Sequence, residues 1–126
     1  MFRAIHHVAI ICSDYEISKK FYTEILGFEI IKETFREERN SHKLDLRMGD
    51  IQIELFSFPE PPRRLSYPEA AGLRHLAFSV KNIQETKLEL EEKKIKVEEI
   101  RIDEQTGKKY TFFQDPDALP IEIYEI

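Results

Sequence analysis

Two short stretches, HHVAII at residues 6–11 and RHLAFS at residues 74–79, decide the fold of this chain. Each places a histidine just before alternating apolar residues, a pattern that predicts a β-strand with one buried face. The chain has only four histidines, yet His7 and His75 occupy the same slot in the two stretches. This agreement indicates an internal repeat.

The two halves of the chain align at one constant offset in residue number, which places His7 on His75. We call it the repeat offset. Identical or similar residues then fall together along the whole half: Ala9 with Ala77, Asp14 with Asn82, Ile53 with Ile121, Glu54 with Glu122, and Leu55 with Ile123. The repeat offset also lays DIQIELF over ALPIEIY, each with a glutamate between two aliphatic residues. The halves are therefore predicted to be two equivalent modules.

Each module is predicted to contain a strand, a helix and three further strands. The first helix begins at a capping Ser13 or Asp14 and ends at Gly27, with an apolar face of Ile17, Phe21 and Ile25. The strands are predicted at residues 5–11, 28–35, 43–48 and 51–58, and again at 73–80, 96–102, 109–114 and 119–126, with the second helix at 82–95. Gly49 and Asp50 are predicted to form a tight hairpin turn between the last two strands of the first module.

The fold class that follows is α+β. We expect two tandem βαβββ modules, residues 1–58 and 72–126, that form a cupped, barrel-like mixed sheet with helices on the outside. Residues 59–71 lie in a proline-rich stretch and form a connector, and residues 1–126 make one domain. Two modules must meet to enclose a site, either within one chain or across a homodimer.

The strand period places one histidine and one glutamate of each module on the same polar-lined face, opposite residues such as Ile53 and Leu55. A lone histidine in a strand is usually a hydrogen-bonded core residue, and a lone glutamate is usually solvated. Two carboxylates buried close together, however, need a compensating cation. Two imidazoles and two carboxylates suit a borderline divalent ion such as Zn²⁺, Ni²⁺, Co²⁺, Mn²⁺ or Fe²⁺.

The paired modules, the opening strands HHVAI and LRHLAF, and the ending FQDPDALPIEIYE resemble the vicinal oxygen chelate superfamily, with glyoxalase I as the nearest match. The resemblance implies that His7, Glu54, His75 and Glu122 bind one divalent metal ion per site, Zn²⁺ or Ni²⁺ before Co²⁺ or Mn²⁺. It also implies a homodimer and a lyase or isomerase reaction through a metal-stabilised enediolate. Glu122 is the predicted base, and Glu54 is a ligand or serves the opposite face of the substrate.

The sequence departs from glyoxalase I at three positions. Ile11 and Phe58 stand where those enzymes usually carry an arginine, which grips the glutathione carboxylate, and an asparagine, so the sequence does not identify glutathione as the thiol. Ala118 replaces the usual glycine of the DPDG turn and would be strained at a positive φ. An epimerase, a thiol transferase and a small-molecule-sequestering protein remain alternatives.

The substrate-contacting residues are predicted on the same polar-lined face as the glutamates. They are Lys43 and Arg47, which would hold an anionic tail, and Phe56, Thr111 and Phe113. Thr111 and Phe113 are placed there only by the repeat offset. Arg36, Arg39 and His42 are expected to be solvated loop residues, and a mobile rim of the site is the alternative.

Composition narrows the class of protein. A net charge of −5 and a pI near 5.4 argue against a nucleic-acid partner. No apolar run approaches the length of a membrane span, and the first residues lack a secretory signal, so we expect a cytoplasmic protein. The one cysteine, Cys12, excludes an internal disulfide and is predicted to be buried and inert.

Overall fold

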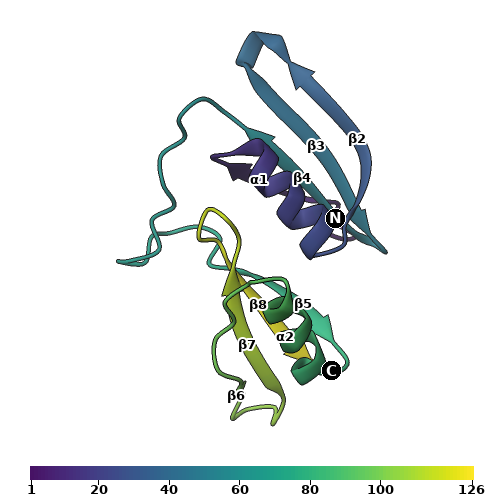
Figure 1. Ribbon diagram of the computed structural model, residues 1–126, viewed down its shortest axis with the longest axis vertical. Coiled ribbons are helices and arrows are strands. Elements are labelled where there is room, and N and C mark those ends of the chain that lie inside the picture. Colours follow the sequence, from purple (N-terminus) through teal and green to yellow (C-terminus); the bar gives the residue numbers. More distant parts are fainter. The chain divides into compact units, whose positions relative to one another are not determined.

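A computed structural model describes residues 1–126, which divide into two compact units, Met1–Arg63 and Arg64–Ile126. Figure 1 shows their elements, and each unit is described by itself. Residues 58–75, which include the predicted connector, form neither helix nor strand. No helix in either unit is long and apolar enough to cross a membrane.

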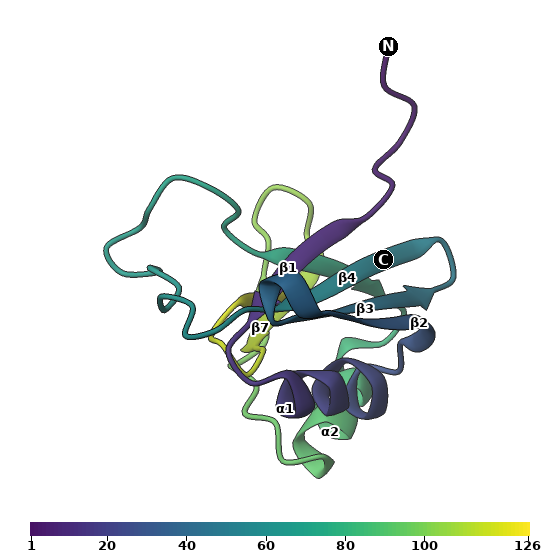
Figure 2. The same ribbon diagram turned by 90° about the horizontal axis from the view of Figure 1, so that it is seen from above.

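The first unit contains one four-stranded mixed sheet in the order β1-β4-β3-β2. Strand β1 runs parallel to β4, and the other neighbours are antiparallel. Its elements are β1 (Val8–Cys12), α1 (Tyr15–Lys20), the π-helical segment η1 (Phe21–Ile25), β2 (Glu29–Arg36), the 3₁₀ turn η2 (Glu37–Arg39), β3 (Ser41–Met48) and β4 (Ile51–Ser57). The helix α1 lies against one face of this sheet (Figure 2).

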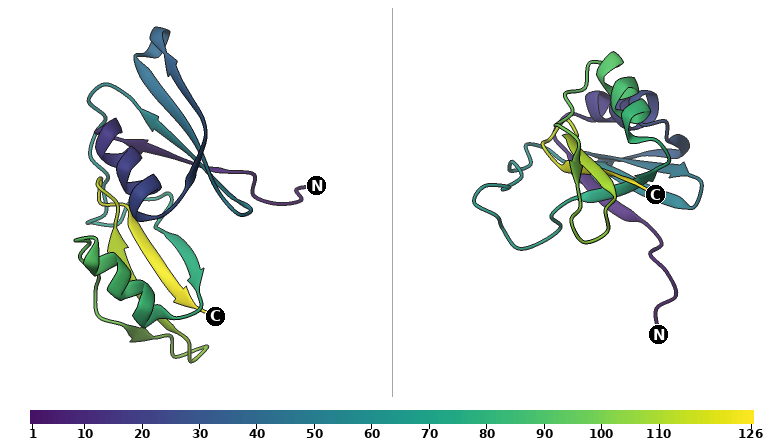
Figure 3. Two further views of the ribbon diagram at one scale, coloured as in Figure 1. Left: turned by 45° about the vertical axis from the view of Figure 1, so that its right-hand side comes forward. Right: turned by 90° about the horizontal axis from the view of Figure 1, so that it is seen from below.

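The second unit repeats this plan with a sheet in the order β5-β8-β7-β6. Its elements are β5 (Leu76–Val80), α2 (Ile83–Glu92), β6 (Arg101–Ile102), β7 (Lys109–Gln114) and β8 (Pro120–Glu125), and α2 lies beside the sheet (Figure 3). The predicted α+β class with two βαβββ modules is confirmed. The strands form two four-stranded sheets without a closed barrel.

Equivalent side chains start the two helices. The carboxylate of Asp14 accepts from the backbone N–H of Ile17, and the amide oxygen of Asn82 accepts from that of Glu85. The apolar face predicted for the first helix is wrong at Ile17, which is 56% exposed. Phe21 is buried as predicted, and the other buried side chains of this segment are Tyr15, Ser18 and Tyr22.

The core of each unit lies between the helix and one face of the sheet. Alternate residues of the central strands fill it, as the period of two requires. In the first unit these are Leu44, Leu46, Ile53 and Leu55; in the second they are Phe113, Ile121 and Ile123. Cys12 is buried in the first of these cores, as predicted.

The predicted strand at residues 96–102 forms only at its last two residues, Arg101 and Ile102. The segment before them still lies against β7. The backbone N–H of Glu98 donates to the carbonyl of Phe112 at 2.9 Å, and the hydroxyl of Thr111 donates to the carbonyls of Glu98 and Glu99. A side-chain hydroxyl thus replaces part of the strand ladder here.

Candidate metal and substrate site

In the second unit, parallel pairing of β5 and β8 brings a histidine and a glutamate together. Ala77 pairs with Glu122, so His75, two residues before Ala77, lies next to the glutamate side chain. The Nε2 atom of His75 lies 2.9 Å from Oε2 of Glu122, and Phe112 meets the imidazole ring edge to face at 5.1 Å. The side chains of His75 and Glu122 are only 28% and 14% exposed.

The first unit repeats the arrangement, and its register agrees with the repeat offset. Ala9 of β1 pairs with Glu54 of β4, and Nε2 of His7 lies 3.3 Å from Oε2 of Glu54. The Nδ1 atom of His6 lies 2.9 Å from Nδ1 of His7, on the side of the ring away from Glu54. Only His7 therefore contacts the glutamate, as the alignment predicts.

A lysine distinguishes the first pair from the second. The ammonium of Lys43 lies 3.3 Å from Oε1 of Glu54 and 3.4 Å from Oδ1 of Asp45. Burial disfavours the charged form of Lys43, but hydrogen bonds to Glu54 and Asp45 outweigh this effect and raise its pKa above the ordinary value. Lys43 is therefore a cation fixed beside Glu54.

The donor atoms in each unit fit one side of a metal ion. Two ligands that each lie about 2.1 Å from one ion, at angles of 90° to 110°, are about 3.0 to 3.4 Å apart. The nitrogen-to-oxygen distances are 2.9 Å for His75 and Glu122 and 3.3 Å for His7 and Glu54. No group of three or more candidate ligands gathers in either unit, so each unit holds two of the four predicted donors and the complete site stays a prediction.

The repeat offset fails on the strand next to Glu122. In the first unit Asp45 faces Glu54, so the same offset would place Phe113 opposite Glu122, but Phe112 stands there. The prediction that Thr111 and Phe113 lie on the glutamate's face of the sheet is therefore wrong. Their side chains point into the core and are 0% and 3% exposed.

The cause is the length of the two hairpins. The first turn has two residues, Gly49 and Asp50, whereas the second has the five residues Asp115–Leu119. The longer turn shifts β7 by one residue, and a shift of one exchanges the two faces of a strand. The residues that share a face with Glu122 are Tyr110 and Phe112, which sequence analysis missed; the unequal turns were the available signal.

The other predicted substrate residues lie on the glutamate's face of the first unit. Lys43 pairs with Phe56 and Arg47 with Gln52 on β4. The expectation that Arg36 and His42 are loop residues is wrong, because β2 extends to Arg36 and β3 begins at Ser41. Only Arg39, in η2, is an exposed turn residue as expected.

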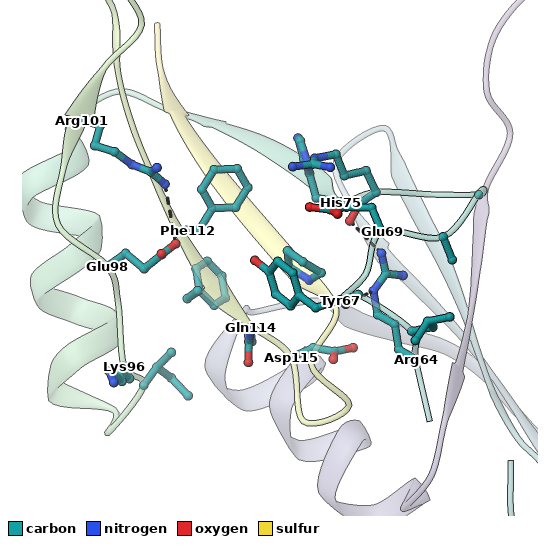
Figure 4. A pocket seen from close by; sticks show the side chains of 18 of the residues that line it. Arg64, Tyr67, Glu69, His75, Lys96, Glu98, Arg101, Phe112, Gln114 and Asp115 are labelled. Atoms are coloured by element: carbon teal, nitrogen blue, oxygen red, sulfur yellow. Dashed lines mark hydrogen bonds and ion pairs between the residues drawn. The ribbon is translucent and has the colours of Figure 1, made fainter. Parts of the chain in front are cut away.

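A pocket of about 890 Å³ lies within the second unit, and His75 lines it (Figure 4). Its wall combines the ring of Phe112 with charged side chains: Arg64, Arg74, Lys94, Lys96 and Arg101, against Glu69, Glu98 and Asp115. In a chain of net charge −5, this lining has an excess of basic residues. The pocket offers an aromatic and basic surface beside the histidine.

The model of one protein family matches residues 4–123, which covers both His–Glu pairs. The chain belongs to the Glyoxalase/Bleomycin resistance protein/Dioxygenase superfamily. Among superfamily relatives, the chain is 60% identical to the Bacillus subtilis protein named "Uncharacterized protein YwkD", over 99% of this chain and 98% of that protein. A solved glyoxalase family protein from Enterococcus faecalis is 52% identical, with a TM-score of 0.94 and 98% of both chains covered.

More distant relatives in this superfamily carry enzyme names. Bovine mitochondrial methylmalonyl-CoA epimerase is 29% identical over 90% of this chain and 68% of that protein. The Arabidopsis thaliana protein named "Glyoxylase I 4" is 30% identical over 95% of this chain and 69% of that protein. Many superfamily members are thus enzymes, and the two relatives named here are called an epimerase and a glyoxylase.

Proposed function

We propose that this protein is a metal-dependent, glyoxalase I-like lyase that isomerises the thiol hemithioacetal of a 2-oxoaldehyde to a 2-hydroxy thioester. The observation that carries the proposal is the close pairing of His75 with Glu122, repeated by His7 with Glu54. Together these side chains would hold one divalent ion, Zn²⁺ or Ni²⁺ before Co²⁺ or Mn²⁺. The ion would supply positive charge beside two substrate oxygens and so stabilise the charge that develops when the neighbouring proton leaves.

The proton transfer is assigned to Glu122. Its carboxylate would take the proton from the carbon that bears sulfur and return it to the adjacent carbonyl carbon, while the hydroxyl proton moves to the other oxygen. The reaction is an isomerisation that needs no oxidant or reductant. Glu122 suits this role because His75 is its only ion-pair partner, whereas Lys43 holds Glu54 in place.

An epimerase is the second candidate, supported by the similarity to bovine methylmalonyl-CoA epimerase. The first step would be the same removal of a proton next to a carbonyl group. The proton would then return to the opposite face of the same carbon, with Glu54 as the second acid–base group. Thiol transfer and sequestration of a small molecule remain further alternatives.

The proposal is tested by metal content and by turnover. The purified chain should contain about one divalent ion per site, and His75→Ala should sharply lower this content. His6→Ala is the matched control, because His6 contacts His7 and not a glutamate. Metal-loaded protein should then isomerise methylglyoxal adducts of at least one cellular thiol; failure with every adduct would favour the epimerase.

We also propose a homodimer in which His7 and Glu54 of one chain meet His75 and Glu122 of the other. Mixing His7→Ala with Glu122→Gln chains tests this arrangement. Random exchange would restore an intact site in about a quarter of all sites, because each mixed dimer combines two unmutated halves once. No recovery after confirmed exchange would favour sites built within one chain.

A further inference from the structure

Each unit carries an arginine that lies over two aromatic rings on the glutamate's face of its sheet. In the first unit, Cζ of Arg36 lies 4.8 Å from the ring centre of Phe56 and 5.7 Å from that of Phe58. In the second, Cζ of Arg101 lies 5.1 Å and 5.6 Å from the rings of Tyr110 and Phe112. Both guanidinium groups are thus positioned by aromatic surfaces.

The two arginines differ in whether a carboxylate lies close enough to neutralise their charge. Arg101 lies 3.7 Å from the carboxylate of Glu98, and both side chains are more than half exposed. Arg36 has no carboxylate partner; its Nη2 donates to the hydroxyl of Ser41 at 2.9 Å, and its Nε is buried without an acceptor. An unpaired buried donor destabilises the unit unless a ligand supplies the acceptor.

The other basic residue near Phe56 is already neutralised. The ammonium of Lys43 lies 6.0 Å from the ring centre of Phe56, but it is shared between Glu54 and Asp45. An incoming anion would have to compete with both carboxylates for Lys43, whereas at Arg36 it would meet an uncompensated guanidinium. Phe56 follows Glu54 by two residues on the same face of β4, a spacing of about 7 Å along the strand.

We infer that Arg36 determines substrate specificity by binding an oxyanion, which is a carboxylate or a phosphate. This oxyanion belongs to the thiol-derived part of the substrate, and the reacting carbons of the substrate lie near Glu54. The statement that this ligand is a substrate rests on the proposed function. Arg36 would bind the anion with its planar fork, and Phe56 and Phe58 would hold that fork in place. Arg36 thereby takes the role that the sequence analysis gave to Lys43, whose charge is shared between Glu54 and Asp45.

The binding step is tested without turnover, by titrating inorganic phosphate and, separately, succinate into the ¹⁵N-labelled full-length protein. We expect the amide signals of Ser41 and Phe56 to shift on titration and the shifts to be lost in Arg36→Met. Arg36→Lys should weaken binding by about tenfold, because an ammonium lacks the guanidinium fork. Arg101→Met, the matched control, should keep the shifts.

Shifts that persist in Arg36→Met, or that disappear only in Arg101→Met, overturn the assignment, as does the absence of shifts near Arg36 in the wild type. Should Arg36→Met fail to fold, unchanged affinity in Arg36→Lys overturns it instead. The substrate role is tested with adducts of anionic and neutral thiols: Arg36→Met should lower kcat/KM about tenfold for the anionic adducts alone, and an equal loss for both overturns it. If no adduct reacts, the proposed function fails, while the titrations still decide whether Arg36 binds an oxyanion.

Discussion

In the unit Met1–Arg63 the carboxylate of Glu54 has two ion-pair partners, His7 and Lys43, whereas in the unit Arg64–Ile126 the carboxylate of Glu122 has one, His75. The strands that position the two glutamates are equivalent residue by residue. The difference therefore arises from the neighbouring strand, which supplies Lys43 and Asp45 in the first unit and Tyr110 and Phe112 in the second. The two units therefore share the histidine–glutamate pair and differ in the side chains that the neighbouring strand places beside it.

The largest expected effect separates the two glutamates. Glu122→Gln should lower isomerisation by ~10² or more, because the assigned base is lost, and should retain substantial metal. Glu54→Gln should reduce turnover less, since Lys43 already restrains that carboxylate. Metal analysis and initial rates on both variants measure the difference; equal losses, or a wild-type rate in Glu122→Gln, would show that Glu122 is not the distinct base.

The second prediction concerns Lys43, which distinguishes the pair of His7 and Glu54 from the pair in the second unit. Lys43→Met takes a fixed positive charge away from Glu54 and Asp45, so a divalent ion should bind about tenfold more tightly at low ionic strength. Arg47→Met is the matched control, because Arg47 lies on the same strand and pairs with Gln52 rather than with Glu54 on β4. Competition with a chromophoric chelator measures both affinities. Weaker binding in Lys43→Met would mean that the lysine orients Glu54 for the ion.

The strands that position the two glutamates could be predicted from the sequence, whereas the neighbouring strand of the second unit could not. Strands β1, β4, β5 and β8 could be paired from one offset, because their side-chain period and the two glutamates agree with it. The register of β7 could not, since the offset carries no information on a turn that is three residues longer. Face assignments for Thr111 and Phe113 failed for that reason alone.

The position of Arg36 could not be predicted for a related reason. Its neighbours in the sequence are charged, so a hairpin loop is the ordinary expectation. In the structure Arg36 pairs with Ser41 across an extended hairpin, which directs its side chain toward Phe56. The helix phase failed at Ile17 while the capping residue Asp14 was correct, because a cap depends on local chemistry and a buried face depends on packing.

The third prediction compares the two hairpin turns. Ala118 has a φ of 64°, a conformation that glycine adopts without strain, and Gly49 in the first unit has a φ of 55°. Ala118→Gly should therefore stabilise the protein, and Gly49→Ala should destabilise it, each by about 1 kcal/mol in the free energy of unfolding. Apart from its two chain neighbours, no heavy atom would lie within 4 Å of a Cβ at position 49, so the cost there is confined to the backbone. Urea unfolding of the two variants measures both values; a destabilised Ala118→Gly would show that the turn is held by contacts of the methyl group.

The smallest expected effect concerns how each helix is tied to its sheet. In the first unit Lys19 of α1 lies 2.7 Å from Glu33 of β2, which also accepts a hydrogen bond from the hydroxyl of Tyr15. In the second, Glu125 of β8 accepts from the backbone N–H of Ile83. The hydrogen bond from Lys19, followed by that from Tyr15, lowers the pKa of Glu33 below its ordinary value of 4.5.

A carboxyl group with a lowered pKa in the folded state stabilises the protein above its unfolded-state pKa, and this contribution is lost as the pH falls through the folded-state value. Glu33→Gln should therefore reduce stability at neutral pH, and the difference from the wild type should disappear in acid. The Glu33 side chain is 41% exposed, which keeps the neutral-pH difference below about 1 kcal/mol. Urea unfolding between neutral pH and pH 3 measures it, and a difference that stays constant with pH would mean that Glu33 acts through packing, because only the ionised carboxylate gains from Lys19.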